Sequence, residues 1–141
     1  MRANDPGMIP LWVDTNVLIR LLTDDPPEMS ARATELAVRA ETGELRLRVA
    51  PLVVAETVWV LLSFYGYSRE GVAEALISLL RADGVQAEEG RLVVAALESM
   101  ARFNVDFVDG YLAEVARSKG EAVCSFNRDF ARLDVEWMLP G

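Results

Sequence analysis

Two acidic residues follow apolar segments that have the length of β-strands. Asp14 comes directly after the segment 9–13, and Asp129 comes shortly after the segment 122–126. In parallel sheets whose strands alternate with helices, ligands bind outside the carboxyl ends of the strands. Both residues are therefore candidates for a functional site, although Asp14 could simply cap a helix and Asp129 could simply stabilise a turn.

Three further acidic residues fall on expected helices. Glu56 is the only charged residue in the segment 51–64. A helix that is apolar nearly all round is expected to be buried, and Glu is rarely buried unless it is paired or bound to metal. An ion pair with an arginine, or a position at an exposed edge, would also explain it. Asp106 and Asp109 can share a helix face and gain from the helix dipole; Asp106 is explained as a cap, Asp109 less easily.

The amino-acid composition restricts the chemistry that these carboxylates could perform. Histidine is absent from the 141 residues, which excludes Ser-His-Asp triads, His-containing zinc sites and imidazole acid–base catalysis. Carboxylates that gather closely resist ionisation unless a cation compensates them, and ligation by oxygen alone favours Mg²⁺ or Mn²⁺. Such an ion in an open acidic cleft suits phosphoryl chemistry, because it activates water and neutralises charge on the phosphate.

Length and charge set further limits. With 141 residues, of which 52% are apolar, we expect one domain over residues 8–141, preceded by a flexible lead-in of residues 1–7. A formal charge of −8 argues against broad, charge-driven binding of nucleic acid. The single Cys124 is expected to be a small buried hydrophobe. Without a disulfide or a membrane-spanning run, a cytoplasmic location is expected.

Apolar periodicity and capping residues predict alternating strands and helices. The expected helices cover about 17–22, 28–42, 52–64, 68–82, 88–102 and 108–119, with a short turn or helix at 130–133. The expected strands cover 9–13, 45–49, 122–126 and 135–138, and the alternation of Leu with Arg46 and Arg48 indicates a half-exposed strand at 45–49. This order predicts an α/β fold with a parallel sheet, in which three of these acidic residues could converge at one end.

The order and spacing of four segments resemble the PIN domain family over nearly the whole chain after Gly7. These segments are Val13-Asp14-Thr15-Asn16, the apolar helix with Glu56, residues 106–113 and residues 125–130. The compact form is similar to the VapC-type toxins of toxin–antitoxin pairs. The resemblance implies a three-layer α/β/α fold, in which helices flank a central, mostly parallel sheet of four to five strands.

The resemblance also implies a Mg²⁺- or Mn²⁺-dependent endoribonuclease with one or two ions per site, in which metal-activated water attacks phosphorus. Asp14 and Asp109 would hold the principal metal, Asp129 would complete its shell, and Glu56 would bind a second ion or orient the water. The side chains expected to hydrogen-bond these carboxylates or metal-bound waters are Thr15, Asn16, Asp106, Ser125 and Asn127. Where the family often has Asp, this chain has Asn127.

Substrate and partners follow from the resemblance together with the charge. Because the whole surface is acidic, contacts to RNA should come from local cations, for which Arg20, Arg46, Arg48 and Arg128 are candidates; a solvated surface position is the plain alternative for each. A cognate antitoxin and a homodimer are expected partners. The aromatic residues at 59, 64, 65 and 67 are expected to lie mostly in the core, although any left exposed could form a dimer face or a groove for an antitoxin helix.

Two other classes of function remain as alternatives. The first is a catalytically silent PIN-like module that binds RNA or protein. The second is a phosphotransfer receiver or a haloacid-dehalogenase-like phosphatase, which also places Asp at strand ends. Those families use an aspartyl phosphate with a Lys partner, and the phosphatases carry a second Asp two residues after the first. Here that position is Asn16, and the only lysine is Lys119, which ranks this class below a nuclease. Retention of all four acidic positions ranks the silent module below a nuclease as well.

Overall fold

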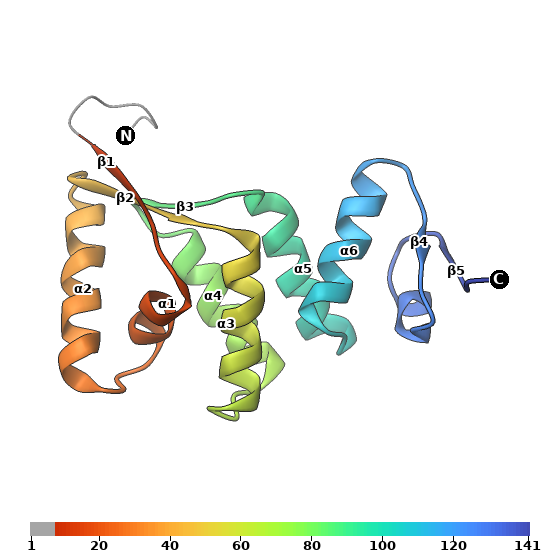
Figure 1. The fold of residues 1–141 in the computed structure, drawn as a ribbon, viewed down its shortest axis with the longest axis horizontal. Helices are drawn as coiled ribbons and strands as arrows, with labels where there is room; N and C mark the ends of the chain where they lie inside the picture. Colours follow the sequence, from red (N-terminus) through yellow and green to blue (C-terminus); the bar gives the residue numbers. More distant parts are fainter. Residues whose placement is uncertain (1–7) are drawn as a thin grey trace.

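The computed structural model describes residues 8–141, so the expected lead-in of residues 1–7 lies outside the described part (Figure 1). Strands and helices alternate along the chain, as expected. The elements in order are β1 (Ile9–Trp12), α1 (Thr15–Leu22), α2 (Pro27–Glu41), β2 (Leu45–Val49), α3 (Pro51–Ser63), α4 (Arg69–Leu80), β3 (Val85–Ala87), α5 (Gly90–Phe103), α6 (Phe107–Ser118), β4 (Val123–Cys124), the 3-10 helix η1 (Arg128–Arg132) and β5 (Trp137–Met138).

Helix boundaries follow from local capping. Asp14 caps α1, since its Oδ1 accepts a hydrogen bond from the Val17 amide at 3.1 Å. Ser68 caps α4 in the same way, through the Gly71 amide at 3.0 Å. Proline opens both α2 and α3, where its missing N–H costs no helical hydrogen bond. These residues explain why the predicted helix starts lie within two residues of the observed ones.

The strands form two parallel sheets. In the first, β2 lies between β1 and β3, and Ile9 to Trp12 align with Leu45 to Arg48. In the second, β4 pairs with β5. The predicted α/β class and parallel pairing are therefore confirmed, but the expected single central sheet of four to five strands is divided into a three-stranded and a two-stranded sheet. β3 was not predicted, because a strand of three residues is too short to show an alternating pattern in the sequence.

The prediction of a half-exposed strand at β2 is wrong. β2 is the middle strand, and Arg46 is only 6% exposed. Its Nη1 donates to Gln86 Oε1 on β3 at 2.9 Å, which offsets part of the cost of burying the guanidinium. Because other elements cover the faces of a parallel sheet, the alternation of residue type along β2 did not reveal the burial of its side chains.

The core consists of two clusters. The larger one is built on the three-stranded sheet and α1 to α5, and it also takes in Phe107 from the first turn of α6. The smaller one joins α6 to β4 and η1 through residues such as Ala113, Val123 and Phe130. Figure 1 shows α5 and α6 lying between the three-stranded sheet and the two-stranded sheet, which sits at the opposite end of the molecule from α2. No helix within residues 8–141 is long and apolar enough to span a bilayer.

Candidate functional site

The end of β1 and the exposed face of α3 bring together the first group of candidate residues. Asp14 follows β1, and its hydrogen bond from the Val17 amide confirms the interpretation that this residue caps α1. The Thr15 hydroxyl donates a hydrogen bond to Glu56 Oε1, which links the start of α1 to α3. Thr15 therefore does hold one of the candidate carboxylates, as the family resemblance implied. We refer to Asp14, Thr15 and Glu56 as the N-terminal half-site.

Glu56 is exposed, contrary to the expectation of a buried carboxylate in an apolar helix. Its neighbours at helical spacing on the same face, Leu52 and Trp59, are also exposed, by 82% and 64%. The opposite face of α3 is buried in the larger core cluster through residues such as Val54 and Leu61. α3 thus has apolar residues on two faces, and only one of these faces is buried within the chain.

A second group of candidate residues lies where α6 and η1 begin. Asn127 Nδ2 donates to Asp109 Oδ2 at 2.8 Å, and Asn127 Oδ1 accepts from the Asp129 amide at 3.0 Å. Ser125 Oγ accepts from the Asn127 amide at 2.9 Å, so it orients Asn127 rather than a carboxylate. Arg132 donates to Asp129 Oδ1 at 2.7 Å. We refer to Asp109, Asn127 and Asp129 as the C-terminal half-site.

The electrostatics of the C-terminal half-site centre on Asp109. Burial raises the pKa of its carboxyl above the usual range, and the negative charges of Asp106 and Asp129 raise this pKa further. The hydrogen bond from Asn127 opposes the shift. Two neighbouring carboxylates thus act on Asp109, and a cation would relieve this repulsion.

Asp106 takes the N-cap position of α6, but its side chain makes no cap hydrogen bond, so the capping explanation is wrong in its detail. Its Oδ1 instead accepts from Arg69 Nη2 at 2.8 Å, while Arg69 Nη1 donates to Asn104 at 2.9 Å. Arg69 thereby ties α4 to the turn between α5 and α6. Arg69 was not predicted from the sequence, because its partners are distant along the chain. Arg132 was not predicted either, although it lies one helical turn after Asp129.

The two half-sites do not meet within one chain. Among residues 8–141, no three Asp, Glu or Cys side chains lie close enough to form a group that could hold a metal ion. Asp14 follows a strand of the three-stranded sheet, whereas Asp129 follows β4 of the separate sheet. The expectation that three acidic residues converge at one end of a single sheet is therefore wrong for the single chain. The donor chemistry suits a hard cation, but neither half-site alone is a complete metal site.

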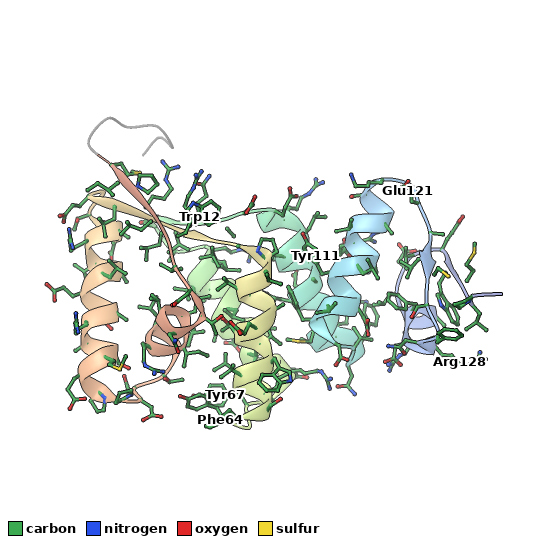
Figure 2. The ribbon with its side chains drawn as sticks, in the orientation of Figure 1. Trp12, Phe64, Tyr67, Tyr111, Glu121 and Arg128 are labelled. Atoms are coloured by element: carbon green, nitrogen blue, oxygen red, sulfur yellow. The ribbon has the colours of Figure 1, made fainter. Side chains whose placement is uncertain are left out.

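The four candidate arginines have different surroundings. Arg46 and Arg48 both bond Gln86, and Arg48 also lies over the Trp12 ring at 5.3 Å, so both have structural contacts within the sheet. Arg128 is exposed on η1, at the opposite end of the molecule from Trp12 in Figure 2. Arg20 lines a groove between α1 and α2 together with Asn16.

Several apolar residues expected inside are outside. Trp59, Phe64 and Tyr67 are exposed, so the expectation that the aromatic cluster lies mostly in the core is wrong; Phe64 and Tyr67 sit beyond the end of α3 (Figure 2). Cys124 is exposed as well, contrary to the expected burial. It lies on β4, whose side opposite β5 has no neighbouring strand in residues 8–141.

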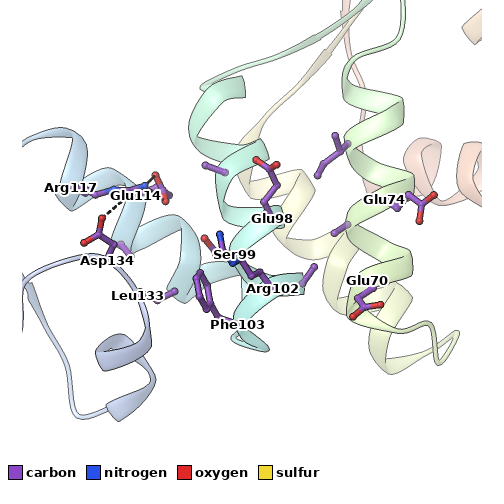
Figure 3. A pocket seen from close by; sticks show the side chains of 15 residues that line it. Glu70, Glu74, Glu98, Ser99, Arg102, Phe103, Glu114, Arg117, Leu133 and Asp134 are labelled. Carbon is purple, nitrogen blue, oxygen red and sulfur yellow. Dashed lines mark hydrogen bonds and ion pairs between the residues drawn. The ribbon is translucent and has the colours of Figure 1, made fainter.

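A groove of about 800 Å³ lies between α4, α5, α6 and the segment after η1 (Figure 3). Its charged lining includes Glu70, Glu98 and Arg117, and the Arg117 guanidinium pairs with Glu114 and with Asp134 at 3.3 Å. None of the four candidate acidic residues lines it. The candidate chemistry therefore lies on open surfaces outside this groove.

A family model described as the PIN domain matches residues 11–136, a span that includes both half-sites. The comparison with curated proteins gives no match.

Proposed function

Because this chain belongs to the PIN domain family, whose members are generally nucleases, we propose that it is a Mg²⁺- or Mn²⁺-dependent endoribonuclease. The observation that carries the proposal is the family match over residues 11–136, which includes all four candidate acidic residues. Asp14, Glu56, Asp109 and Asp129 supply only oxygen donors, the type that Mg²⁺ and Mn²⁺ prefer.

The hydrogen bonds of the half-sites suggest a role for each supporting residue. Thr15 orients the Glu56 carboxylate, and Asn127 orients Asp109 while its own position is set by Ser125. Residues that hold ligand side chains in this way increase the geometric precision of a metal site. A bound divalent ion would supply Lewis acidity toward a phosphodiester and a water of lowered pKa. Arg128 and Arg20 are our candidates for contacts to RNA phosphates.

We further propose that the protein acts as the toxin of a VapBC-type pair in the cytoplasm, with one domain over residues 8–141. Exposed aromatic side chains support a partner, since Trp59, Phe64 and Tyr67 leave apolar area uncovered. An amphipathic antitoxin helix is a suitable ligand for such a surface. Co-purification with a small protein encoded beside it would support the pairing, and a partnerless protein with no effect on growth would contradict it.

One observation favours a second candidate, the catalytically silent module. Within the described residues of one chain, no three acidic side chains form a metal-binding group. A silent module would retain the fold and bind RNA or protein without hydrolysis. It would bind divalent ions weakly, and Asp14→Asn would leave its behaviour unchanged.

Cleavage assays separate the two candidates. The purified protein is incubated with tRNA and with structured RNA in Mg²⁺, in Mn²⁺ and in EDTA, beside Asp14→Asn and Asp109→Asn. We expect cleavage only with the ions and a loss of at least about 100-fold in each variant, which is typical for a group that holds a metal or stabilises charge in the reaction. Asp24→Asn is the matched control, because it removes one exposed carboxylate that belongs to neither half-site. Cleavage that persists in EDTA or in both variants would refute the metal mechanism.

A further inference from the structure

We propose that two copies of this chain form a reciprocal dimer in which β4 of each copy adds to the free edge of β1 of the other. Each complete site then combines Asp14 and Glu56 of one copy with Asp109 and Asp129 of the second copy. The pairing itself is argued from the fold, and its catalytic consequence rests on the proposed function.

The free edges of β1 and β4 each carry one outward backbone amide, because Pro10, at the other free-edge position of β1, has no N–H. Ile9 and Val13 donate their amides to β2, so alternation directs the intervening Trp12 amide away from the sheet. On β4 and just beyond it, Val123 and Ser125 donate to the β5 side, so the Cys124 amide points away in the same manner. Both strands belong to parallel sheets, and joining them gives one continuous sheet in the order β3-β2-β1-β4-β5, with the last two strands from the second copy.

Large, exposed apolar side chains lie along both edges. Along β1, Ile9 and Trp12 are 53% and 58% exposed. After β4, Phe126 is 79% exposed, and Met138 on β5 is exposed too. An exposed apolar edge strand is a template for pairing with another chain, and natural proteins commonly protect such edges. Covering both edges in one step removes this exposure.

Each half-site lies within an uncovered apolar surface. On α3, Glu56 lies between Leu52 and Trp59 at helical spacing. On α6, Asp109 lies beside Val108 and close to Leu112, both of which are exposed. Docking these surfaces excludes water from the carboxylates and brings the two half-sites toward a single cation. A second copy of the chain supplies the missing half-site to each copy, so that both sites of the dimer are complete. An unrelated partner would not supply these half-sites.

The packing of α6 favours a second copy over closure of the same chain. Phe107, in the first turn of α6, is buried in the larger core cluster and stacks on Tyr111. At Gly110 the two helices approach so closely that a Cβ would lie 3.1 Å from the carbonyl oxygen of Ala96 on α5. The α5–α6 pair thus holds β4 at the far end of its own chain from β1 (Figure 1). Closure within one chain would require either that α6 leaves α5 and Phe107 leaves the core, or that β4 and η1 leave α6 and break the smaller core cluster.

The native Cys124 allows a direct test that does not depend on activity. Trp12→Cys places a second thiol on the free edge of β1, and a short bis-maleimide is added to the purified full chain. We expect a covalent dimer on a reducing gel and a dimer mass by light scattering. The wild-type chain and Trp12→Cys/Cys124→Ser are the controls, and neither should give this product. A link confined to one chain, a monomer mass, or a dimer without this link would overturn the proposal.

Mixing two inactive variants tests the composite site. Asp14→Asn and Asp109→Asn are unfolded together and refolded, so that the copies exchange. Random pairing leaves one intact combination among the four types of site, so we expect about a quarter of the wild-type activity, whereas each variant refolded alone is inactive. Active wild type with no recovery in the mixture would overturn the proposal. If the wild type itself is inactive but Trp12→Cys cross-links between copies, the dimer stands and the nuclease function fails.

Discussion

Replacing Gly84 with alanine is expected to destabilise the protein through one defined contact. Gly84 precedes β3 with φ of +82°, and a Cβ there would lie 2.3 Å from the carbonyl oxygen of Ala40, a buried residue of α2. The Gly84 carbonyl also accepts a hydrogen bond from the Leu47 amide at 2.8 Å, so the turn cannot shift without disturbing β2. The added methyl group therefore has little room to escape the contact.

The expected magnitude is a sum of three effects. A positive φ costs a residue with a side chain about 1–2 kcal/mol. Overpacking against a backbone atom costs about 1–3 kcal/mol. The lower entropy of the unfolded alanine chain returns about 0.4–1 kcal/mol. We therefore expect Gly84→Ala to lower the free energy of unfolding by about 3 kcal/mol, equivalent to a Tm decrease of roughly 6–12 °C for a chain of this size.

Gly66→Ala is the matched control, since Gly66 has φ of +68° but no atom within 4 Å of its Cβ position. Only the backbone cost and the entropy gain apply there, so about 1 kcal/mol is expected. Both variants are compared with wild type by urea unfolding at one protein concentration, because dimerisation would make stability concentration-dependent. Equal destabilisation of the two variants would refute the assigned contact with Ala40.

Three further perturbations have definite expected outcomes. Asp109→Asn should raise Tm in EDTA at pH 7, because folding raises the pKa of the Asp109 carboxyl and its ionised form therefore opposes folding. This gain in Tm should vanish as the pH falls toward 4, and a gain that is the same at both pH values would contradict this reasoning. Val54→Ala should cost about 2 kcal/mol by urea unfolding, and Val38→Ala, at an exposed helical position, less than about 0.5 kcal/mol. A double-mutant cycle of Arg69→Met with Asp106→Asn should show a coupling of about 0.5–1 kcal/mol, and zero coupling would mean that this ion pair does not stabilise the turn.

Local chemistry in the sequence determined most of the helices and the identity of the candidate residues. Ser68 and Pro51 mark helix starts because capping and the fixed φ of proline act within a single turn. The cap made by Asp14 was predictable for the same reason. Asp14, Glu56 and Asp109 could be selected because apolar residues precede them along the chain, and Asp129 because it follows an expected strand. Neither criterion needs knowledge of distant contacts.

Burial was less predictable, since it depends on which elements become neighbours. Arg46 is buried because β3, a strand of three residues, supplies Gln86 to its guanidinium. Glu56 is exposed because the α3 face that carries it has no packing partner within the chain. The residue types alone do not decide either outcome. The Leu–Arg alternation of β2 is compatible with a buried or a half-exposed strand, and the apolar sequence of α3 is compatible with a buried or an exposed Glu56.

The sequence by itself determined that the chemistry must use oxygen donors, that α/β elements position them, and which four acidic residues are candidates. Only the tertiary structure decided how these residues are grouped. The close approach of α5 and α6 at Gly110 and the burial of Phe107 hold Asp109 and Asp129 away from Asp14 and Glu56. Such long-range packing depends on the summed contacts of whole surfaces, whereas caps, periodicity and spacing report only on neighbours along the chain.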